Sequence, residues 1–224
     1  MKPLIRVFAA LLAPLILFGC RQPANTPLPK AALPTVESTS TQSAGVKATA
    51  SGENYLLVQP EHSEAPAPTL KAETGTLPET QTFTNHTSAE GKYDIQAPDT
   101  WKKEERGASL RFTHNMSGML VEIIQSAEPF SIDTVKGVQV AGLVRTGRAV
   151  DIKIVTMAET KGGQAVYVEY ESNSEPVKGK QHRQINHRYY FGHNGLLAVL
   201  TLWAPVGADN ENIWKQIPDT FYWR

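Results

Sequence analysis

Proline and aromatic residues are distributed so unevenly along this chain that only its C-terminal part can form a packed core. Residues 21–82 contain eight of the fifteen prolines and a single aromatic residue, Tyr55, whereas all four tryptophans lie beyond residue 100. A segment with so few large apolar side chains cannot bury enough surface to offset the entropy lost on ordering. The sequence therefore predicts a disordered tether over residues 20–82, followed by one folded domain over residues 83–224.

The N-terminus has the three parts of an export signal. Lys2 and Arg6 supply positive charge, residues 7–18 are apolar apart from Pro14, and the small residue Gly19 follows. The apolar run is shorter than the roughly 20 residues that a membrane-spanning helix needs. We therefore expect residues 1–19 to be a signal peptide and the rest of the chain to lie outside the cytoplasm.

The single cysteine of the chain, Cys20, comes directly after this signal. The run Leu17-Phe18-Gly19-Cys20 resembles the bacterial lipobox, although Phe18 is larger than the residue usual at that position. The resemblance implies that the peptide is cut before Cys20, that the thiol carries a diacylglyceryl group and that the new amino group is acylated, commonly with palmitate. Two or three acyl chains would hold the protein stably in a membrane. The alternative is an ordinary secretory signal that happens to end in cysteine.

The balance of charge argues against a nucleic-acid partner. The 22 basic and 22 acidic side chains cancel, so there is no chain-wide positive field of the kind that nucleic-acid binding usually needs. The one local positive excess comprises Lys178, Lys180, Arg183 and Arg188. These residues predict contact with anionic lipid headgroups or with an acidic protein face. A solvated pair of strands is the simpler alternative.

Alternation of apolar and polar residues predicts a series of strands in the domain. We expect strands over residues 93–97, 110–114, 119–125, 150–159, 164–171, 182–191 and 196–203. In the fourth of these, Val150, Ile152 and Ile154 should share one face. Asn194-Gly195 is a strong hairpin signal. The strand after it is apolar on both faces, which is typical of a central strand covered on both sides.

Two segments are predicted to be helical. Ser131 is suited to cap a helix from Ile132 to about Arg145, and Asp209 to cap a short helix that Pro218 ends. A series of strands with one helix midway and one near the end predicts an α+β fold, an antiparallel sheet flanked by helices. We expect Trp203 and Trp214 to be buried in its core.

The order of motifs in the domain resembles that of the PsbP-like family. The domain opens on the pattern Tyr-x-Ile-x-x-Pro-x-x-Trp at residues 93–101, continues through a Val-Tyr-Val-Glu-Tyr strand at residues 166–170, and closes on the aromatic run at residues 220–223. The family includes the photosystem II extrinsic protein, the Ran-binding Mog-type proteins and bacterial lipoproteins of the DcrB-like and LpqN-like groups. The resemblance implies an α/β/α sandwich with a mainly non-catalytic, partner-binding role, and it supplies no catalytic residues.

Histidines are the most conspicuous candidates for chemistry. His182, His187 and His193 fall within twelve residues, but the first two have opposite parity on one strand and should face opposite sides. We therefore favour a partly buried, hydrogen-bonded His187 over a metal site. Glu169 and Glu171 repeat at a spacing of two, as paired catalytic acids could, although an alternating solvent-facing surface explains them more simply. We expect no metal, no cofactor and no catalytic residue.

Together these features predict a lipoprotein anchored through Cys20 in the cell membrane or the outer membrane. Its domain is expected to be a non-catalytic binding or accessory module for another envelope component, or for a photosystem component if the source is photosynthetic. The alternative is an envelope hydrolase or a small-ligand-binding lipoprotein. A pocket between the sheet and a helix, with convergent polar groups and titratable residues of shifted pKa, would favour this alternative.

Overall fold

The computed structural model describes residues 64–71 and 74–224 of the chain. The predicted signal peptide, Cys20 and residues 20–63 of the predicted tether lie outside the described residues. Within the described residues, none of the helices has both the length and the apolar character needed to cross a membrane.

Strands make up most of the described chain, as the alternation of its residues predicts. The strands are β1 (Phe83–Ser88), β2 (Tyr93–Pro98), β3 (Lys102–Arg106), β4 (Ser109–His114), β5 (Ser117–Gln125), β6 (Asp151–Thr160), β7 (Gly163–Asn173), β8 (Arg183–His193), β9 (Leu196–Pro205) and β10 (Tyr222–Trp223). The helical segments are α1 (Ile132–Thr134), the π-helical turn η1 (Val135–Val140), α2 (Ala141–Thr146), α3 (Glu211–Gln216) and the 3₁₀ turn η2 (Pro218–Thr220).

Seven of the strands form one antiparallel sheet in the order β3-β4-β5-β9-β8-β7-β6. The strand predicted to be central, β9, lies in the middle of this order, and its side chains are mostly buried. The hairpin between β8 and β9 turns at Asn194 and Gly195, whose φ values of 47° and 75° are those of the tight turn that this dipeptide favours. A second sheet has the order β1-β2-β10.

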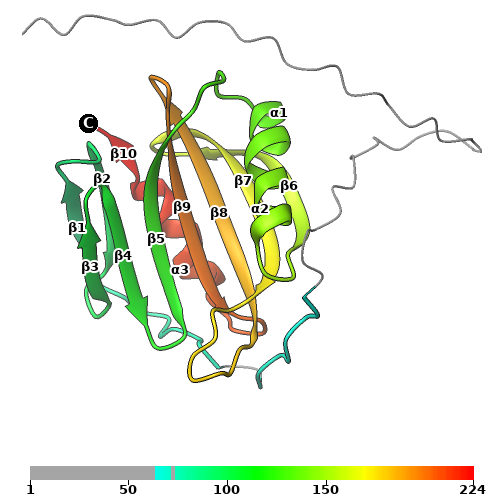
Figure 1. The fold of residues 1–224 in the computed structure, drawn as a ribbon. Helices are drawn as coiled ribbons and strands as arrows, with labels where there is room; N and C mark the ends of the chain where they lie inside the picture. The colour runs from blue at the N-terminus through cyan, green and yellow to red at the C-terminus, as the bar shows by residue number, and fades with distance from the viewer. Residues whose placement is uncertain (1–63, 72–73) are drawn as a thin grey trace, which may run out of the picture. The chain divides into compact units, whose positions relative to one another are not determined.

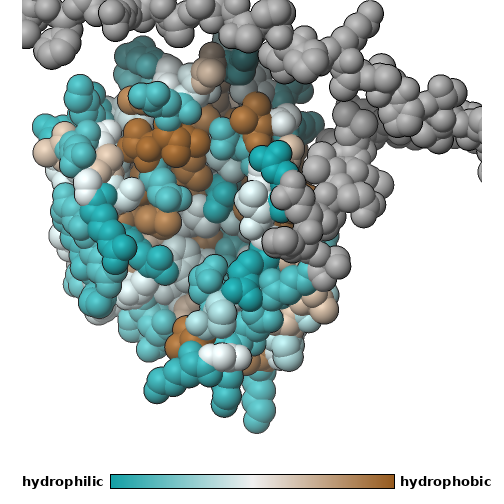
Figure 2. Space-filling view, in the orientation of Figure 1, coloured by the Kyte–Doolittle hydropathy of each residue, from teal (hydrophilic) through white to brown (hydrophobic). Residues whose placement is uncertain are grey.

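Helices cover the two faces of the large sheet, so the predicted α+β fold with a flanked antiparallel sheet is confirmed. The continuous helix α1-η1-α2 lies over β7 and β8 on one face, and α3 lies on the other face (Figure 1). Figure 2 shows the first of these faces, where hydrophilic side chains dominate and hydrophobic side chains gather near the end of β5.

The helix predicted from Ile132 to Arg145 is present and continues to Thr146. The Ser131 side chain accepts a hydrogen bond from the Thr134 N–H at 3.0 Å, as a helix cap does. The middle of the helix widens into the π turn η1, which contains Gly137. Valines on its inner side pack against the valines and tyrosines of β7 and β8.

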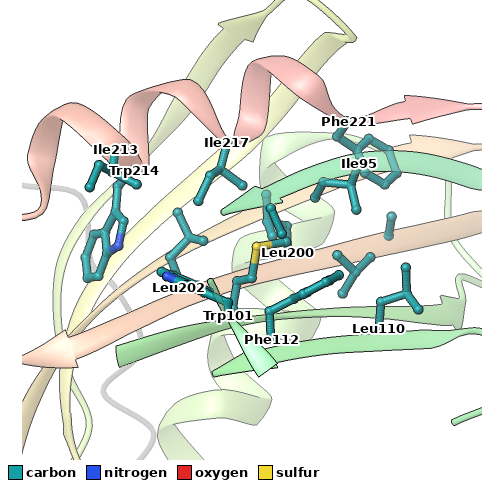
Figure 3. Packing of buried hydrophobic residues seen from close by; sticks show 14 of the residues in the cluster. Ile95, Trp101, Leu110, Phe112, Leu200, Leu202, Ile213, Trp214, Ile217 and Phe221 are labelled. Atoms are coloured by element: carbon teal, nitrogen blue, oxygen red, sulfur yellow. The ribbon is translucent and has the colours of Figure 1, made fainter. Parts of the chain in front are cut away.

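The larger core lies between the sheet, α3 and the small sheet. In Figure 3, Ile213 and Trp214 of α3, and Ile217 directly after it, extend toward the strand that carries Leu200 and Leu202. The prediction that Trp214 is buried is confirmed, because only 3% of it is exposed. The same prediction for Trp203 is wrong. That ring is half-buried on the opposite face of the sheet, where the Arg111 guanidinium lies 5.0 Å from its centroid.

One predicted face of β6 is interrupted. The pairing of β6 with β7 shifts between Ile152 and Ile154, which makes a bulge at Lys153. A bulge reverses the alternation of the residues that follow it. Ile152 and Val155 therefore pack toward the helix, while Ile154 is 44% exposed rather than on the face of Ile152.

The folded part begins before residue 83. Ala67 and Leu77 are buried, and the backbone N–H of Ala67 donates to Asn173 Oδ1 at 2.7 Å. The sequence places the start of the domain later, after residue 82. Amino-acid composition gives no sign of the hydrogen bonds that a polar segment makes to a distant strand. Residues 64–71 and 74–82 therefore belong with the domain, and a tether over residues 20–63 stays a prediction.

Candidate functional site

A groove of about 610 Å³ opens between β7, β8 and the start of α3. Strand side chains line it from the sheet, and residues 207–211 with Trp214 and Lys215 line it from α3 and the loop before it. The side chains on the sheet are Tyr167 and Glu169 of β7 with Ile185, His187 and Tyr189 of β8. The groove lies on the face of the sheet that α3 covers, as expected for a pocket between sheet and helix.

The register of two strands brings the polar and aromatic side chains of the groove together. Tyr167 pairs with Tyr189, and Glu169 pairs with His187. Alternate residues of a strand point to the same face, and directly opposed residues are in contact distance. The interpretation of Glu169 as part of a solvent-facing surface is therefore replaced, because its side chain lies beside His187 in the groove.

Aromatic rings form much of the groove surface. The centroids of Tyr167 and Tyr189 are 5.0 Å apart, and that of Tyr167 is 5.4 Å from His187. The imidazole of His187 also meets the indole of Trp214 edge-on, with centroids 4.7 Å apart. These rings continue the larger core toward solvent and present π faces to anything that enters the groove.

The Glu169 carboxylate lies among the polar side chains of the groove. Tyr167 Oη donates to Glu169 Oε2 at 2.8 Å, and His187 Nε2 lies 3.8 Å from the same oxygen. Burial, assisted by the neighbouring Glu169, raises the pKa of Tyr167, so its hydroxyl stays protonated and donating. The pKa of Tyr189 is raised to about 12 by burial.

The second histidine of the predicted group, His187, is an uncharged member of the groove at neutral pH. Burial lowers the pKa of His187, although the Glu169 and Glu211 carboxylates oppose that shift. On the outer side of the groove, Glu211 forms an ion pair with Lys215 at 2.5 Å. Glu169 and Asp209 add negative charge to the lining, which has Lys215 as its one basic side chain.

Residues assigned by composition to the tether hold one rim of the groove in place. Asn210 Oδ1 accepts from the Leu77 N–H at 2.7 Å, and Asn210 Nδ2 donates to the Gly75 carbonyl at 3.1 Å. The Asp209 N–H donates to Thr76 Oγ1 at 3.1 Å. The helix α3 therefore starts after Asn210, and Asp209 is not its cap as predicted.

The three histidines of the sequence motif lie apart. His182 Nδ1 is 3.1 Å from Ser174 Oγ, and His193 stacks on Trp223 at the far end of β8. His187 is partly buried beside Ile185 and Tyr189, as predicted, and its Nε2 atom lies 3.8 Å from Glu169 Oε2, which is longer than the predicted hydrogen bond. His182 is partly buried as well. Across residues 64–71 and 74–224, no group of three His, Cys, Asp or Glu side chains is placed to hold a metal ion.

The four basic residues predicted to bind a partner do not form one surface. Lys178 and Lys180 are exposed in the turn between β7 and β8. Arg183, by contrast, is 5% exposed. Its Nε atom lies 3.2 Å from Glu171 Oε2, and its Nη1 atom donates to the Ala149 carbonyl at 2.5 Å. Arg183 therefore ties strands together and is not available to a partner.

Arg188 lies on the other face of the sheet from Arg183. Its Nε donates to Thr201 Oγ1 at 2.9 Å, and its guanidinium lies 5.4 Å from the centroid of the Tyr170 ring. The predicted basic surface is thus reduced to two lysines in a turn. A run of basic residues in the sequence does not show which of their side chains become buried when the strands pair.

The chain is similar to several solved structures at low sequence identity. No family model and no curated relative matches the chain. It is similar to cyanobacterial PsbP (CyanoP) from Synechocystis sp. PCC 6803, with 13% identity and a TM-score of 0.43 over 67% of this chain and 98% of that one. It is similar to the Ran-binding protein Mog1p from Saccharomyces cerevisiae, with 7% identity and a TM-score of 0.48 over 64% and 96%.

A third similar structure is LpqN from Mycobacterium tuberculosis, which is described as involved in cell envelope biogenesis. It shares 15% identity and a TM-score of 0.36 over 63% of this chain and 90% of that one. At these identities and TM-scores the likenesses carry no statement about what this chain binds or does. The antiparallel sheet flanked by helices rests on the structure of the chain itself.

Proposed function

We propose that this protein is a bacterial lipoprotein whose folded domain is a non-catalytic binding module, and that the groove beside α3 binds part of another envelope component. The observation that carries the proposal is the groove itself, which combines aromatic rings with the Glu169 carboxylate. Its volume of about 610 Å³ lies within the range of roughly 300–1,000 Å³ typical of binding sites.

The lining of the groove supports binding more than hydrolysis. His187 and Glu169 could accept a proton from a bound molecule, since they lie side by side and His187 is uncharged. Among the described residues that line the groove, none is a serine, threonine or cysteine that such a base could activate. A binding module needs no such nucleophile.

Membrane anchoring is the second part of the proposal, and it rests on the sequence of residues 1–20. A lipid on Cys20 would keep the domain outside the cytoplasm at the cell membrane or the outer membrane, where the local concentration of an envelope partner is high. Cys20→Ser should release the protein into the soluble fraction. Retention of this variant in the membrane pellet after a salt wash would contradict lipid anchoring.

A small molecule is the second candidate for the occupant. The groove satisfies the condition set by the sequence for this alternative, a pocket between sheet and helix with convergent polar groups and shifted pKa values. The bound species should therefore be identified by methods that detect both proteins and metabolites.

The experiment that tests the proposed function fills the groove. Ala208 is half-buried in its lining, whereas Val138 is 53% exposed on the helix that covers the opposite face. We expect that Ala208→Trp abolishes capture of a species that the unchanged chain retains from detergent-solubilised envelope. Val138→Trp, which adds the same ring elsewhere, should retain that species. Equal capture by all three proteins would show that the groove is not the binding site.

A further inference from the structure

We propose that the groove binds an organic cation, an ammonium or guanidinium group, beside the carboxylate of Glu169 and against the rings of Tyr167 and Tyr189. This inference rests on the proposed binding function and names the chemistry of what is bound. It follows from the charge, the aromatic surface and the hydrogen bonds of the groove.

The first observation is the sign of the charge in the groove. Glu169, Asp209 and Glu211 line it, and Lys215 is the one basic residue that does so. Since Lys215 is paired with Glu211, the charge of Glu169 has no basic side chain to balance it within the lining. His187 does not balance it at neutral pH either, because burial favours the neutral imidazole.

The second observation is that Glu169 retains a free acceptor. Its Oε2 atom accepts from Tyr167 Oη, while in the described part of the chain no hydrogen bond reaches its Oε1 atom. The side chain is 26% exposed at the groove. An N–H donor of a bound cation could therefore meet Oε1 without displacing the tyrosine.

The third observation is the aromatic surface around that carboxylate. Tyr167 and Tyr189 lie across the two strands with centroids 5.0 Å apart, and Tyr167 lies within 5.4 Å of the His187 centroid. The faces of such rings attract cations through their quadrupoles, and partial removal from water strengthens the attraction. A neutral apolar ligand would gain from the rings but nothing from Glu169, and an anion would be repelled.

Both a free small cation and the basic side chain of a polypeptide have this chemistry. The two sources differ in size and donors, because a trimethylammonium group has no N–H and relies on ring faces, whereas lysine and arginine also donate to carboxylates. Titration of the full-length chain in detergent with choline, with Nα-acetyl-lysine amide and with Nα-acetyl-arginine amide therefore separates them.

The titration is followed through the indole N–H resonance of Trp214 in ¹⁵N-labelled protein. This ring lies 4.7 Å from His187 at the groove, and its resonance is assigned by its loss in Trp214→Phe. We expect at least one of the three cations to shift it saturably. The neutral tert-butyl isostere of choline should bind about tenfold or more weakly than choline if choline is the cation that binds.

Matched variants identify the groups responsible. Glu169→Gln keeps an acceptor for Tyr167 but removes the charge, and it should weaken binding of the cation about tenfold. Glu122→Gln makes the same change at an exposed position of β5 on the opposite face and should leave the affinity unchanged. Tyr189→Leu should weaken binding, whereas Tyr189→Phe, which keeps the ring face, should preserve it.

The outcomes separate this inference from the proposed function. Failure of all three cations to bind, equal binding of choline and its neutral isostere, or an unchanged affinity in Glu169→Gln would overturn the cation site. If the cation tests fail in this way but Ala208→Trp no longer captures the envelope species, the groove remains the binding site for a ligand of other chemistry. If capture also survives Ala208→Trp, both the groove function and the cation site are refuted.

Discussion

Trp214 belongs to the core and to the groove at once, so its replacement reports on both. The ring is 3% exposed, it packs between α3 and the sheet, and its Nε1 atom has no hydrogen-bond partner among the described residues. We predict that Trp214→Ala lowers the free energy of unfolding by about 3–5 kcal/mol because it leaves a large cavity. Trp214→Phe should cost much less, since it keeps most of the ring and loses no hydrogen bond.

Denaturant unfolding of the two variants measures this difference. An unfolding midpoint for Trp214→Ala equal to that of the unchanged chain would place the ring on a surface and remove it from the core. Equal, large losses in both variants would show that the indole N–H makes a stabilising contact.

The sequence predicted whether single side chains are buried or polar better than it predicted which residues they contact. The parity of β8 placed His187 with Ile185 and Tyr189, as the structure confirms. It could not show that Glu169 faces His187, because that requires the register of β7 on β8. For the same reason the sequence places Arg183 on a surface, although its side chain is buried and pairs with the partly exposed Glu171.

The segment before β1 shows where the folded domain begins. Asn173 and Asn210, both buried, hydrogen-bond to residues 65–77, and Arg148 pairs with Glu64 at 2.8 Å. A chain that starts at Phe83 would leave both asparagines without these partners. Each buried polar group left unpaired costs about 1–3 kcal/mol.

We therefore predict that a chain starting at Phe83 melts at least several degrees below the full-length chain, whereas a chain starting at Glu64 melts with it. Calorimetry of the two shortened chains measures this, since about 1 kcal/mol shifts the midpoint of a domain of this size by roughly 2–4 °C. Equal midpoints for the two shortened chains would show that residues 64–82 add nothing to the fold.

Element positions followed from alternation and turn residues wherever a strand was regular. The strand at β9, the Asn194-Gly195 turn and the helix capped by Ser131 were predicted in this way. Alternation failed at Lys153, where a bulge adds a residue to one strand only. Alternation also gave no sign that residues 64–71 and 74–82 belong to the domain. They are held by hydrogen bonds to distant asparagines and by the isolated buried side chains of Ala67 and Leu77.

For the whole molecule, burial of histidines and tyrosines sets the pH range of stability. Burial lowers the pKa of His86, His182 and His187, so the folded state favours their neutral forms. Stability is then lost as the pH falls below about 6.5, where the unfolded chain takes up protons first. Burial raises the pKa of Tyr93, Tyr167, Tyr170 and Tyr189, so stability is also lost as the pH rises above about 10.

Urea midpoints measured from pH 5 to pH 11 should therefore pass through a plateau between these limits. In His187→Gln the decrease on the acid side should be shallower, because one group that favours the neutral form is gone. A midpoint that rises on acidification below pH 6.5 would contradict the burial of these histidines.

The proposed binding function places the partner of the full-length protein in the groove between β7, β8 and α3. Site-specific photo-cross-linking in living cells tests it most directly, with benzoylphenylalanine placed in the full-length chain at position 208 or at position 138. We expect an adduct of defined mass from position 208, in the groove, and none from position 138, on the opposite face. An adduct from position 138 with none from position 208, or equal adducts from both, would contradict it.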